Sequence, residues 1–185
     1  IAFLMLAAAV AVPALRIGGR MSHEPLSDAA GTNRALIAAA AAGETAEVRR
    51  LLRRGASVRA TDPGGRTALL VAAYNNHPET MAALLAAGSD IDHQDNISDN
   101  PYLYTAAEGH IEALRVALAA KPNLRLTNRY GGTGLIPAAE HGHIEVIREL
   151  LKTDIDVNHV NRLGWTALLE AIILSDGGPR QGEVV

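Results

Sequence analysis

The sequence of 185 residues contains no cysteine, which excludes disulfides, thiolate metal sites and cysteine nucleophiles together. Aromatic residues make up only 3% of the chain, so a stacking platform for nucleic-acid bases is poorly supplied. The net charge is only −3, and it therefore predicts no broad attraction to nucleic acid or to an anionic membrane. Hydrophobic residues are abundant, at 48%, which is enough to form the core of one domain.

The first twenty residues are set apart by their composition. Residues 1–15 form an apolar run without a charge, closed by Arg16 and Arg20, and the run is shorter than a membrane-spanning helix requires. Small residues around Pro13 would serve as a cleavage site, which favours a signal peptide and export to the periplasm or the outside. Alternatively, translation begins at Met21 and the protein is cytoplasmic. Under either interpretation residues 1–20 are excluded from the fold, and the polar residues 21–32 are expected to form a tether.

From residue 33 onward the chain repeats at an interval of 33 residues. A short motif that starts with Thr or Asn recurs at this interval, beginning at Thr67, Asn100, Thr133 and Thr166. Three histidines follow the same interval, namely His77, His110 and His143. The register divides the chain into repeats at 33–61, 62–94, 95–127, 128–160 and 161–185, the last of them incomplete.

Each repeat predicts two short helices. The Thr or Asn that opens the motif is a good N-cap residue, as for a helix over residues 68–74. A second helix follows, with apolar residues at helical spacing such as Ile144 and Ile147. Short extended stretches and a glycine turn, such as Gly64-Gly65, then lead into the next repeat. Because one helix pair cannot bury its apolar face alone, the repeats must stack into one elongated core.

This pattern resembles the ankyrin repeat family. The matching stretches are Gly-Arg-Thr-Ala-Leu-Leu-Val-Ala-Ala from Gly65, Glu-Gly-His-Ile-Glu from Glu108, Glu-Leu-Leu from Glu149 and Gly-Trp-Thr-Ala-Leu from Gly164. The resemblance implies an all-α fold, an ankyrin-type solenoid of stacked helix-turn-helix repeats with short β-hairpin fingers. It also implies a concave face that binds other proteins, without naming a partner.

The chain departs from the family pattern at several positions. Where the family usually has His in the first helix, this chain has apolar residues, namely Ile37, Leu70, Leu103, Ile136 and Leu169. The third finger, at 95–99, lacks the usual glycine, which leaves its turn geometry open. Pro137 falls inside a first helix and is expected to distort its opening turn.

The last repeat breaks the period, because residues 183–185 align with 145–147 only after an insertion around 176–180. The sequence stops where a second helix is expected to continue. We therefore expect a fragment whose C-terminal end exposes an apolar face.

Several features could be mistaken for catalytic or metal-binding chemistry. His141 and His143 are spaced like a metal-binding pair, but His143 occupies a repeat position, which favours a structural role. Gly131–Gly134 lacks the lysine of a phosphate-binding loop and falls in a finger turn. No nucleophile motif of the G-x-S-x-G kind is present. The sequence therefore predicts no catalytic, metal or cofactor site, and a protein that is not an enzyme.

A basic cluster lies on the second helix of the first repeat, at Arg49, Arg50, Arg53 and Arg54. It could dock an acidic partner. The favoured interpretation is a solvated face whose positive charge suits the helix C-terminus.

Residues expected to contact a partner are aromatic, arginine and neighbouring polar side chains on the fingers and first helices, since aromatic and arginine side chains most often anchor interfaces. They are Tyr74, Tyr104, Glu108, Arg129, Tyr130, His141, Arg162 and Trp165. Alternatively, Tyr130 and Trp165 merely cover neighbouring fingers. Tyr102, by contrast, occupies a core leucine position.

The predicted function is a non-catalytic module that binds a partner protein through its fingers and concave first-helix face. No nucleic acid, small-molecule substrate or membrane insertion of the repeats is expected. Two alternatives remain: the interaction region of a larger enzyme with a catalytic domain beyond Val185, or a structural or regulatory subunit in the cell envelope.

Overall fold

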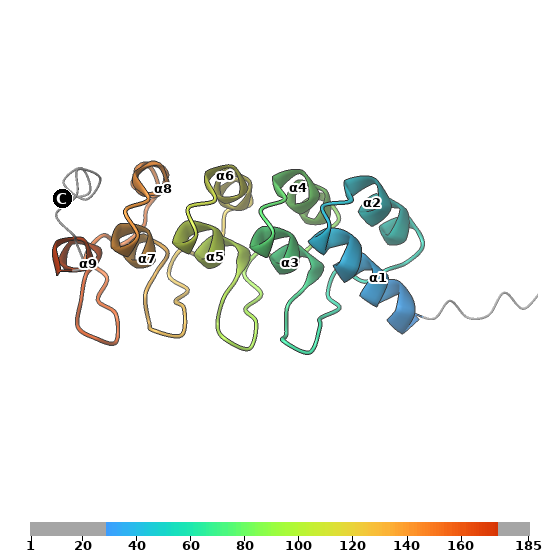
Figure 1. Cartoon of the computed structure of the whole chain (residues 1–185), viewed down its shortest axis with the longest axis horizontal. Coiled ribbons are helices and arrows are strands. Elements are labelled where there is room, and N and C mark those ends of the chain that lie inside the picture. Colours follow the sequence, from blue (N-terminus) through green and yellow to red (C-terminus); the bar gives the residue numbers. More distant parts are fainter. Residues whose placement is uncertain (1–28, 174–185) are drawn as a thin grey trace, which may run out of the picture.

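A computed structural model describes residues 29–173 of the chain. In this part, helices alternate between two layers of one elongated row (Figure 1). The first helices of the repeats are α1 (Ala29–Ala41), α3 (Ala68–Tyr74), α5 (Pro101–Ala107), α7 (Leu135–Glu140) and α9 (Ala167–Ile173). The second helices are α2 (Thr45–Arg53), α4 (Pro78–Ala86), α6 (Ile111–Ala119) and α8 (Ile144–Leu150).

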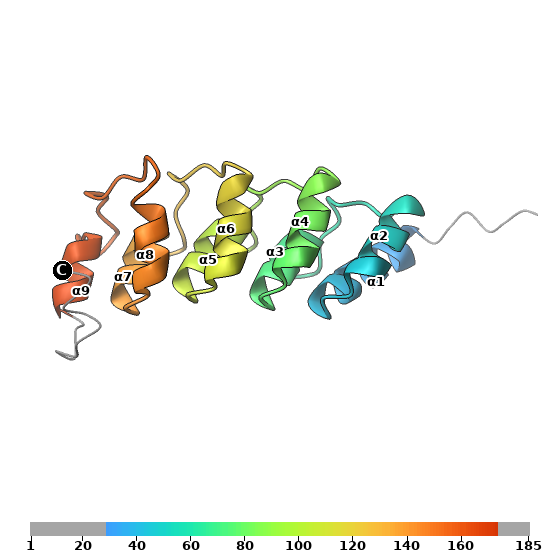
Figure 2. The same cartoon turned by 90° about the horizontal axis from the view of Figure 1, so that it is seen from above.

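Each layer is formed by equivalent helices of successive repeats. Helices α1, α3, α5, α7 and α9 pack in sequence order, and α2, α4, α6 and α8 pack in the same way (Figure 2). The loops that join successive repeats extend below the first-helix layer as fingers (Figure 1). The predicted all-α solenoid is therefore confirmed.

The core between the layers is apolar at the first-helix position where the family usually has a histidine. Leu70, Leu103 and Ile136 are 0%, 2% and 4% exposed. Ile37 in the first repeat is half-buried, and Leu169 in α9 is 40% exposed. Alanines on the inner faces of the helices allow the two layers to approach closely, so the apolar substitution is accommodated without polar partners.

Three of the four predicted N-caps are present. The side chains of Thr67, Asn100 and Thr166 each accept a hydrogen bond from the amide three residues later. The prediction for Thr133 is wrong, because its hydroxyl is buried without a hydrogen-bond partner and α7 has Gly134 as its N-cap. Pro137 explains the difference, since it has no amide hydrogen to donate to the Thr133 carbonyl. The Ile136 amide, which would donate to an N-cap side chain, donates to that carbonyl instead.

The distorted start of α7 is the one expected from Pro137. The Ile136 amide donates to the Thr133 carbonyl at 3.2 Å, and α7 begins one residue later than the repeat register would place it. The Tyr102 hydroxyl of the preceding repeat accepts a hydrogen bond from the Gly134 amide at 2.9 Å. Tyr102 is completely buried, as expected for a core position. A side chain from the neighbouring repeat therefore pairs with one of the amides at the start of α7.

The fingers, which were expected to be short β-hairpins, are tight loops without strands in the described residues. Within residues 29–173 their β pairing is limited to a bridge between Thr61 and Thr67. Each finger is closed by an Asp or Asn whose side-chain oxygen accepts from the amides two and four residues later. The four residues are Asp62, Asp95, Asn128 and Asn161. These local bonds stabilise the turns without continuous strands.

Ser98 occupies the position of the turn glycine in the third finger. Its φ is +65°, and the equivalent residues of the other fingers, Gly65, Gly131 and Gly164, have φ between +77° and +84°. The third finger therefore keeps the left-handed turn, with a serine in place of the glycine that usually supplies it.

The chain ends are only partly covered by the structure. Helix α1 begins at Ala29, so residues 29–32 are helical rather than part of the expected tether. The predicted leader at 1–20, residues 21–28, and the expected period break after residue 173 lie outside the described residues. Over residues 29–173, none of the helices has both the length and the apolar character needed to span a membrane.

Candidate partner-binding groove

Two of the three repeated histidines, His77 and His143, join neighbouring repeats. Ring nitrogens of His77 and His143 lie 3.0 and 3.1 Å from carbonyl oxygens of the preceding repeat. His93 and His159 contact the carbonyl oxygens of Gly65 and Gly131, which lie in the finger turns 28 residues earlier. His77 and His143 therefore contribute to stacking, as their repeat positions indicated, and His93 and His159 hold finger turns in place. Among residues 29–173 there is no group of three or more His, Cys, Asp or Glu side chains that could hold a metal ion.

Most of the predicted partner-binding residues line one groove. The groove has a volume of about 350 Å³ and lies between the third and fourth fingers and the ends of α3, α5 and α7. Six of the eight predicted residues line it, namely Tyr74, Tyr104, Glu108, Arg129, Tyr130 and His141. Ile97, Asp99, Ala107, Asn128, Pro137 and Glu140 complete the lining.

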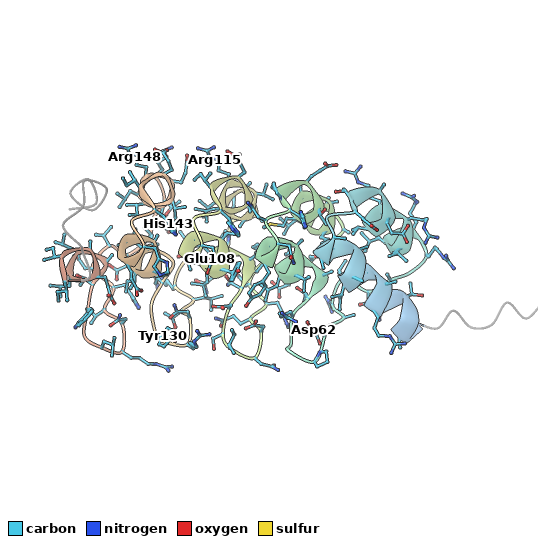
Figure 3. All side chains as sticks on the ribbon, in the orientation of Figure 1. Asp62, Glu108, Arg115, Tyr130, His143 and Arg148 are labelled. Atoms are coloured by element: carbon cyan, nitrogen blue, oxygen red, sulfur yellow. The ribbon has the colours of Figure 1, made fainter. Side chains whose placement is uncertain are left out.

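The repeat register explains why these residues meet. Tyr104 and Glu108 are four residues apart at the end of α5, so they share one face of the helix. His141 follows α7 directly, and Tyr130 belongs to the finger that precedes α7. Figure 3 shows Glu108 beside the first helices and Tyr130 below it among the fingers. Stacking of repeats therefore converts a separation of about one repeat into a short distance.

Tyr74 and Tyr104 form the aromatic wall of the groove. Their ring centroids are 3.9 Å apart, and their planes are tilted by 44°. The Tyr74 hydroxyl lies 3.2 Å from an Asp95 carboxylate oxygen and 3.3 Å from one of Asp99. Because one hydroxyl proton serves two carboxylates, the second carboxylate is less well stabilised. These contacts hold the Tyr74 ring in place behind Tyr104.

The carboxylates around this wall raise the pKa of their neighbours. Burial raises the pKa of Asp99, and the nearby charge of Asp95 raises it further, although the Tyr74 hydroxyl opposes the shift. The pKa of Tyr74 is raised by burial and by both carboxylates. The pKa of Tyr104 is also raised, by burial and then by Glu108 and Asp99. The carboxylates of Asp95, Asp99 and Glu108 therefore surround the aromatic wall with negative charge.

Arginine side chains already lie over two of the rings. The Arg129 guanidinium carbon is 4.8 Å from the centroid of the Tyr130 ring, and that of Arg66 is 5.7 Å from the centroid of Tyr74. Both distances fall within the range of cation–π attraction. Tyr130 is 57% exposed, so its ring and the guanidinium above it form an open edge of the groove.

His141 and His143 both contact the carbonyl oxygen of Ala107. The distances are 2.8 Å from His141 Nδ1 and 3.1 Å from His143 Nε2. A carbonyl oxygen only accepts hydrogen bonds, so these two nitrogens carry protons. Burial and the neighbouring His141 lower the pKa of His143. His143 is thus a structural residue, whereas the exposed His141 forms part of the groove lining.

The remaining two predicted residues are placed beside the groove rather than in it. The Arg162 guanidinium donates to the carbonyl of Arg129 at 2.8 Å, and the Arg162 amide donates to the carbonyl of Tyr130 at 3.0 Å. Arg162 therefore joins the fifth finger to the fourth. Trp165 is half-buried, and its amide donates to Asn161 within the fifth finger.

Two acidic residues of the groove were missed in the sequence. Asp99 precedes the N-cap Asn100, and Glu140 precedes His141 at the end of α7. The available signal was position, because both residues adjoin residues already singled out. The contact of Asp99 with Tyr74 spans 25 residues and does not follow the repeat interval, so periodicity could not reveal it.

The basic cluster lies on the other side of the molecule. Arg50 pairs with Glu47 at 2.6 Å, while Arg49 and Arg53 line a second groove of about 440 Å³ beside the alanine-rich face of α4. Figure 3 shows Arg115 and Arg148 on this second-helix side, away from Tyr130. Arg115 bridges α6 and α8 through Glu149 at 3.0 Å. This side is therefore a charged surface with several internal ion pairs.

Comparison with known proteins matches the chain to the family model described as ankyrin repeats (3 copies), over residues 4–95 and 102–178. The first matched stretch begins inside the segment expected to be a leader. A crystal structure of an ankyrin repeat domain from Acinetobacter baumannii is 46% identical, with a TM-score of 0.78, covering 80% of this chain and 76% of that chain. A crystal structure of the ankyrin repeat protein EF0377 is 40% identical, with a TM-score of 0.78, covering 83% and 78%. Comparison with curated proteins gives no significant match.

Proposed function

This chain belongs to the ankyrin repeat family, and on that premise we propose that it is a non-catalytic module that binds a partner protein in the groove between its third and fourth fingers. Ankyrin repeats are generally protein–protein interaction modules. The observation that carries the proposal is that one groove is lined by six of the side chains that the sequence predicts to contact a partner.

The groove is suited to binding because its walls are held in place before a partner arrives. Tyr74 is fixed by hydrogen bonds to Asp95 and Asp99, and Tyr104 packs on the Tyr74 ring. Arg129 lies over Tyr130. Side chains that are already ordered lose less conformational entropy on association, which increases the net affinity from a given contact area.

The proposal extends to Arg162 and Trp165 as a supporting edge. Arg162 holds the fourth finger through the carbonyl of Arg129. The Arg162 side chain therefore helps to position the Arg129–Tyr130 pair, and a partner longer than the groove would continue over Trp165.

Affinity capture from the protein's own cells, followed by binding measurements with the identified partner, tests this function. Tyr104→Ala is expected to cost roughly 2 kcal/mol or more of binding free energy if Tyr104 is an anchor. Arg49→Ala on the opposite side is the matched control and should leave affinity unchanged. If Arg49→Ala abolishes binding and Tyr104→Ala leaves it intact, the binding surface is the second-helix side and the proposal is wrong.

A further inference from the structure

We propose that the groove recognises a partner segment through a lysine or arginine side chain, which binds between the Tyr104 ring and the carboxylates of Asp99, Glu108 and Glu140. The inference rests on the proposed function, because it names the chemistry of the partner that the same groove takes. It assigns to this groove a cationic ligand rather than an acidic or purely apolar one.

The charges that line the groove favour a cation. Asp99, Glu108 and Glu140 contribute carboxylates, and Arg129 is the arginine among the lining residues. Asp95 lies directly behind, since it shares the Tyr74 hydroxyl with Asp99, and Arg66 lies over the Tyr74 ring. These four carboxylates therefore outnumber the guanidinium groups of Arg129 and Arg66. Like charges at short range disfavour one another, and an incoming cation relieves that repulsion. The charge of the groove therefore complements a basic side chain.

Burial raises the pKa of Tyr104 most, and Glu108 and Asp99 raise it further, because their carboxylates disfavour a negative charge on the Tyr104 hydroxyl. The same carboxylates attract a cation at this point. Partial burial of Tyr104 reduces screening by water and strengthens this attraction.

The aromatic rings supply the second half of the recognition. The chain already places guanidinium groups over Tyr130 and Tyr74, at 4.8 and 5.7 Å from the ring centroids. Tyr104 instead packs against the Tyr74 ring and the edge of His110. A basic side chain from a partner that reaches Tyr104 would extend this series of cation–π contacts, with Glu108 four residues away on the same helical face.

The test is a selection of random linear peptides displayed on phage against the 185-residue chain, followed by affinity measurements with the selected peptides. Selected peptides are expected to share one position occupied by Lys or Arg. Replacing that residue in the peptide with citrulline or norleucine, which keeps the length and removes the charge, should weaken binding. Raising the salt concentration should weaken binding of the basic peptides as well, because surface electrostatic attraction is screened.

Matched variants locate the contact. Glu108→Gln is expected to weaken binding of the basic peptides about twofold to fivefold. Glu112→Gln on α6 removes the same charge from the second-helix side, where it pairs with Arg115, and should leave affinity unchanged. Tyr104→Phe should retain binding because it keeps the ring, and Tyr104→Leu should lose it.

The outcomes separate this inference from the proposed function. Peptides that lose affinity with Tyr104→Leu but share no basic residue overturn the cationic ligand and leave the groove as the binding site. Peptides whose affinity is insensitive to every groove variant overturn both proposals. A shared Lys or Arg with equal losses for Glu108→Gln and Glu112→Gln also overturns the inference, since the attraction would then be non-specific.

Discussion

Tyr102 and Gly134 are a matched pair across the interface between the third and fourth repeats. Equivalent positions of the neighbouring repeats hold Leu69 and Leu135, so Tyr102 is the larger side chain. A Cβ atom added to Gly134 would lie 2.8 Å from a carbon of the Tyr102 ring, closer than real contacts allow. The ring therefore requires glycine at position 134, while the Gly134 amide uses the Tyr102 hydroxyl as its partner.

This arrangement predicts that Gly134→Ala lowers the stability of the wild type but raises the stability of the Tyr102→Leu variant. In the wild-type chain it should destabilise the fold by about 1–3 kcal/mol, because the added methyl group overpacks a buried contact. Tyr102→Leu alone should cost about 1–3 kcal/mol, since it leaves the buried Gly134 amide unpaired. In the Tyr102→Leu background the clash is gone, and φ of −58° and ψ of −22° suit alanine. Gly134→Ala should then stabilise by about 0.4–1 kcal/mol.

This coupling is measured by urea denaturation monitored by circular dichroism. The proteins compared are the wild type, both single variants and the double variant. Gly132→Ala is the control, because its added Cβ would meet Ile136 at an ordinary 3.4 Å and lies outside the Tyr102 contact. Its effect should be the same whether residue 102 is Tyr or Leu. An equal change in unfolding free energy for Gly134→Ala in both backgrounds would refute the argument.

Two further predictions concern the third finger and alkaline stability. Ser98→Gly should raise the unfolding free energy by about 0.5–1 kcal/mol, because it releases the strain of φ +65° at some cost in chain entropy; a loss of stability in urea denaturation would contradict this. Burial raises the pKa of Tyr102 to about 12, so the stability supplied by the neutral phenol is fully present below the unfolded value of about 10 and is lost as the pH rises through about 12. Over that range the wild type should lose stability more steeply than Tyr102→Phe, and parallel pH profiles would exclude the assignment.

The solenoid could be predicted because it depends on properties that repeat. N-cap residues such as Thr67 and Asn100 and bridging histidines such as His77 recur at one interval, and a shared register leaves few ways to stack the helices. The same register brought Glu108 and His141 to one groove, because equivalent positions of stacked repeats lie side by side.

Departures from the repeat were harder to predict, because each depends on a single pair of side chains. The failed cap at Thr133 follows from Pro137 four residues later, and the Tyr102 hydroxyl that pairs with the Gly134 amide comes from the adjacent repeat. The contact of Tyr74 with Asp99 likewise depends on how far one ring reaches across two fingers. Such pairings are decided by local geometry, which periodicity does not describe.

The bonds between neighbouring repeats also bear on how the chain folds. His77 contacts Ala41 across 36 residues, and Arg162 contacts Arg129 across 33. In both pairs the partners that join two repeats are separated by about one repeat along the chain. Such short sequence separations correspond to a low contact order, which favours rapid folding that can nucleate in one repeat and propagate to its neighbours. The groove is formed by the third and fourth repeats and the end of α3. Local opening of the interfaces between these repeats is therefore sufficient to disrupt the groove. Amide exchange at Gly134, whose amide is buried against Tyr102, should follow local opening of the interface between the third and fourth repeats more closely than global unfolding of the solenoid.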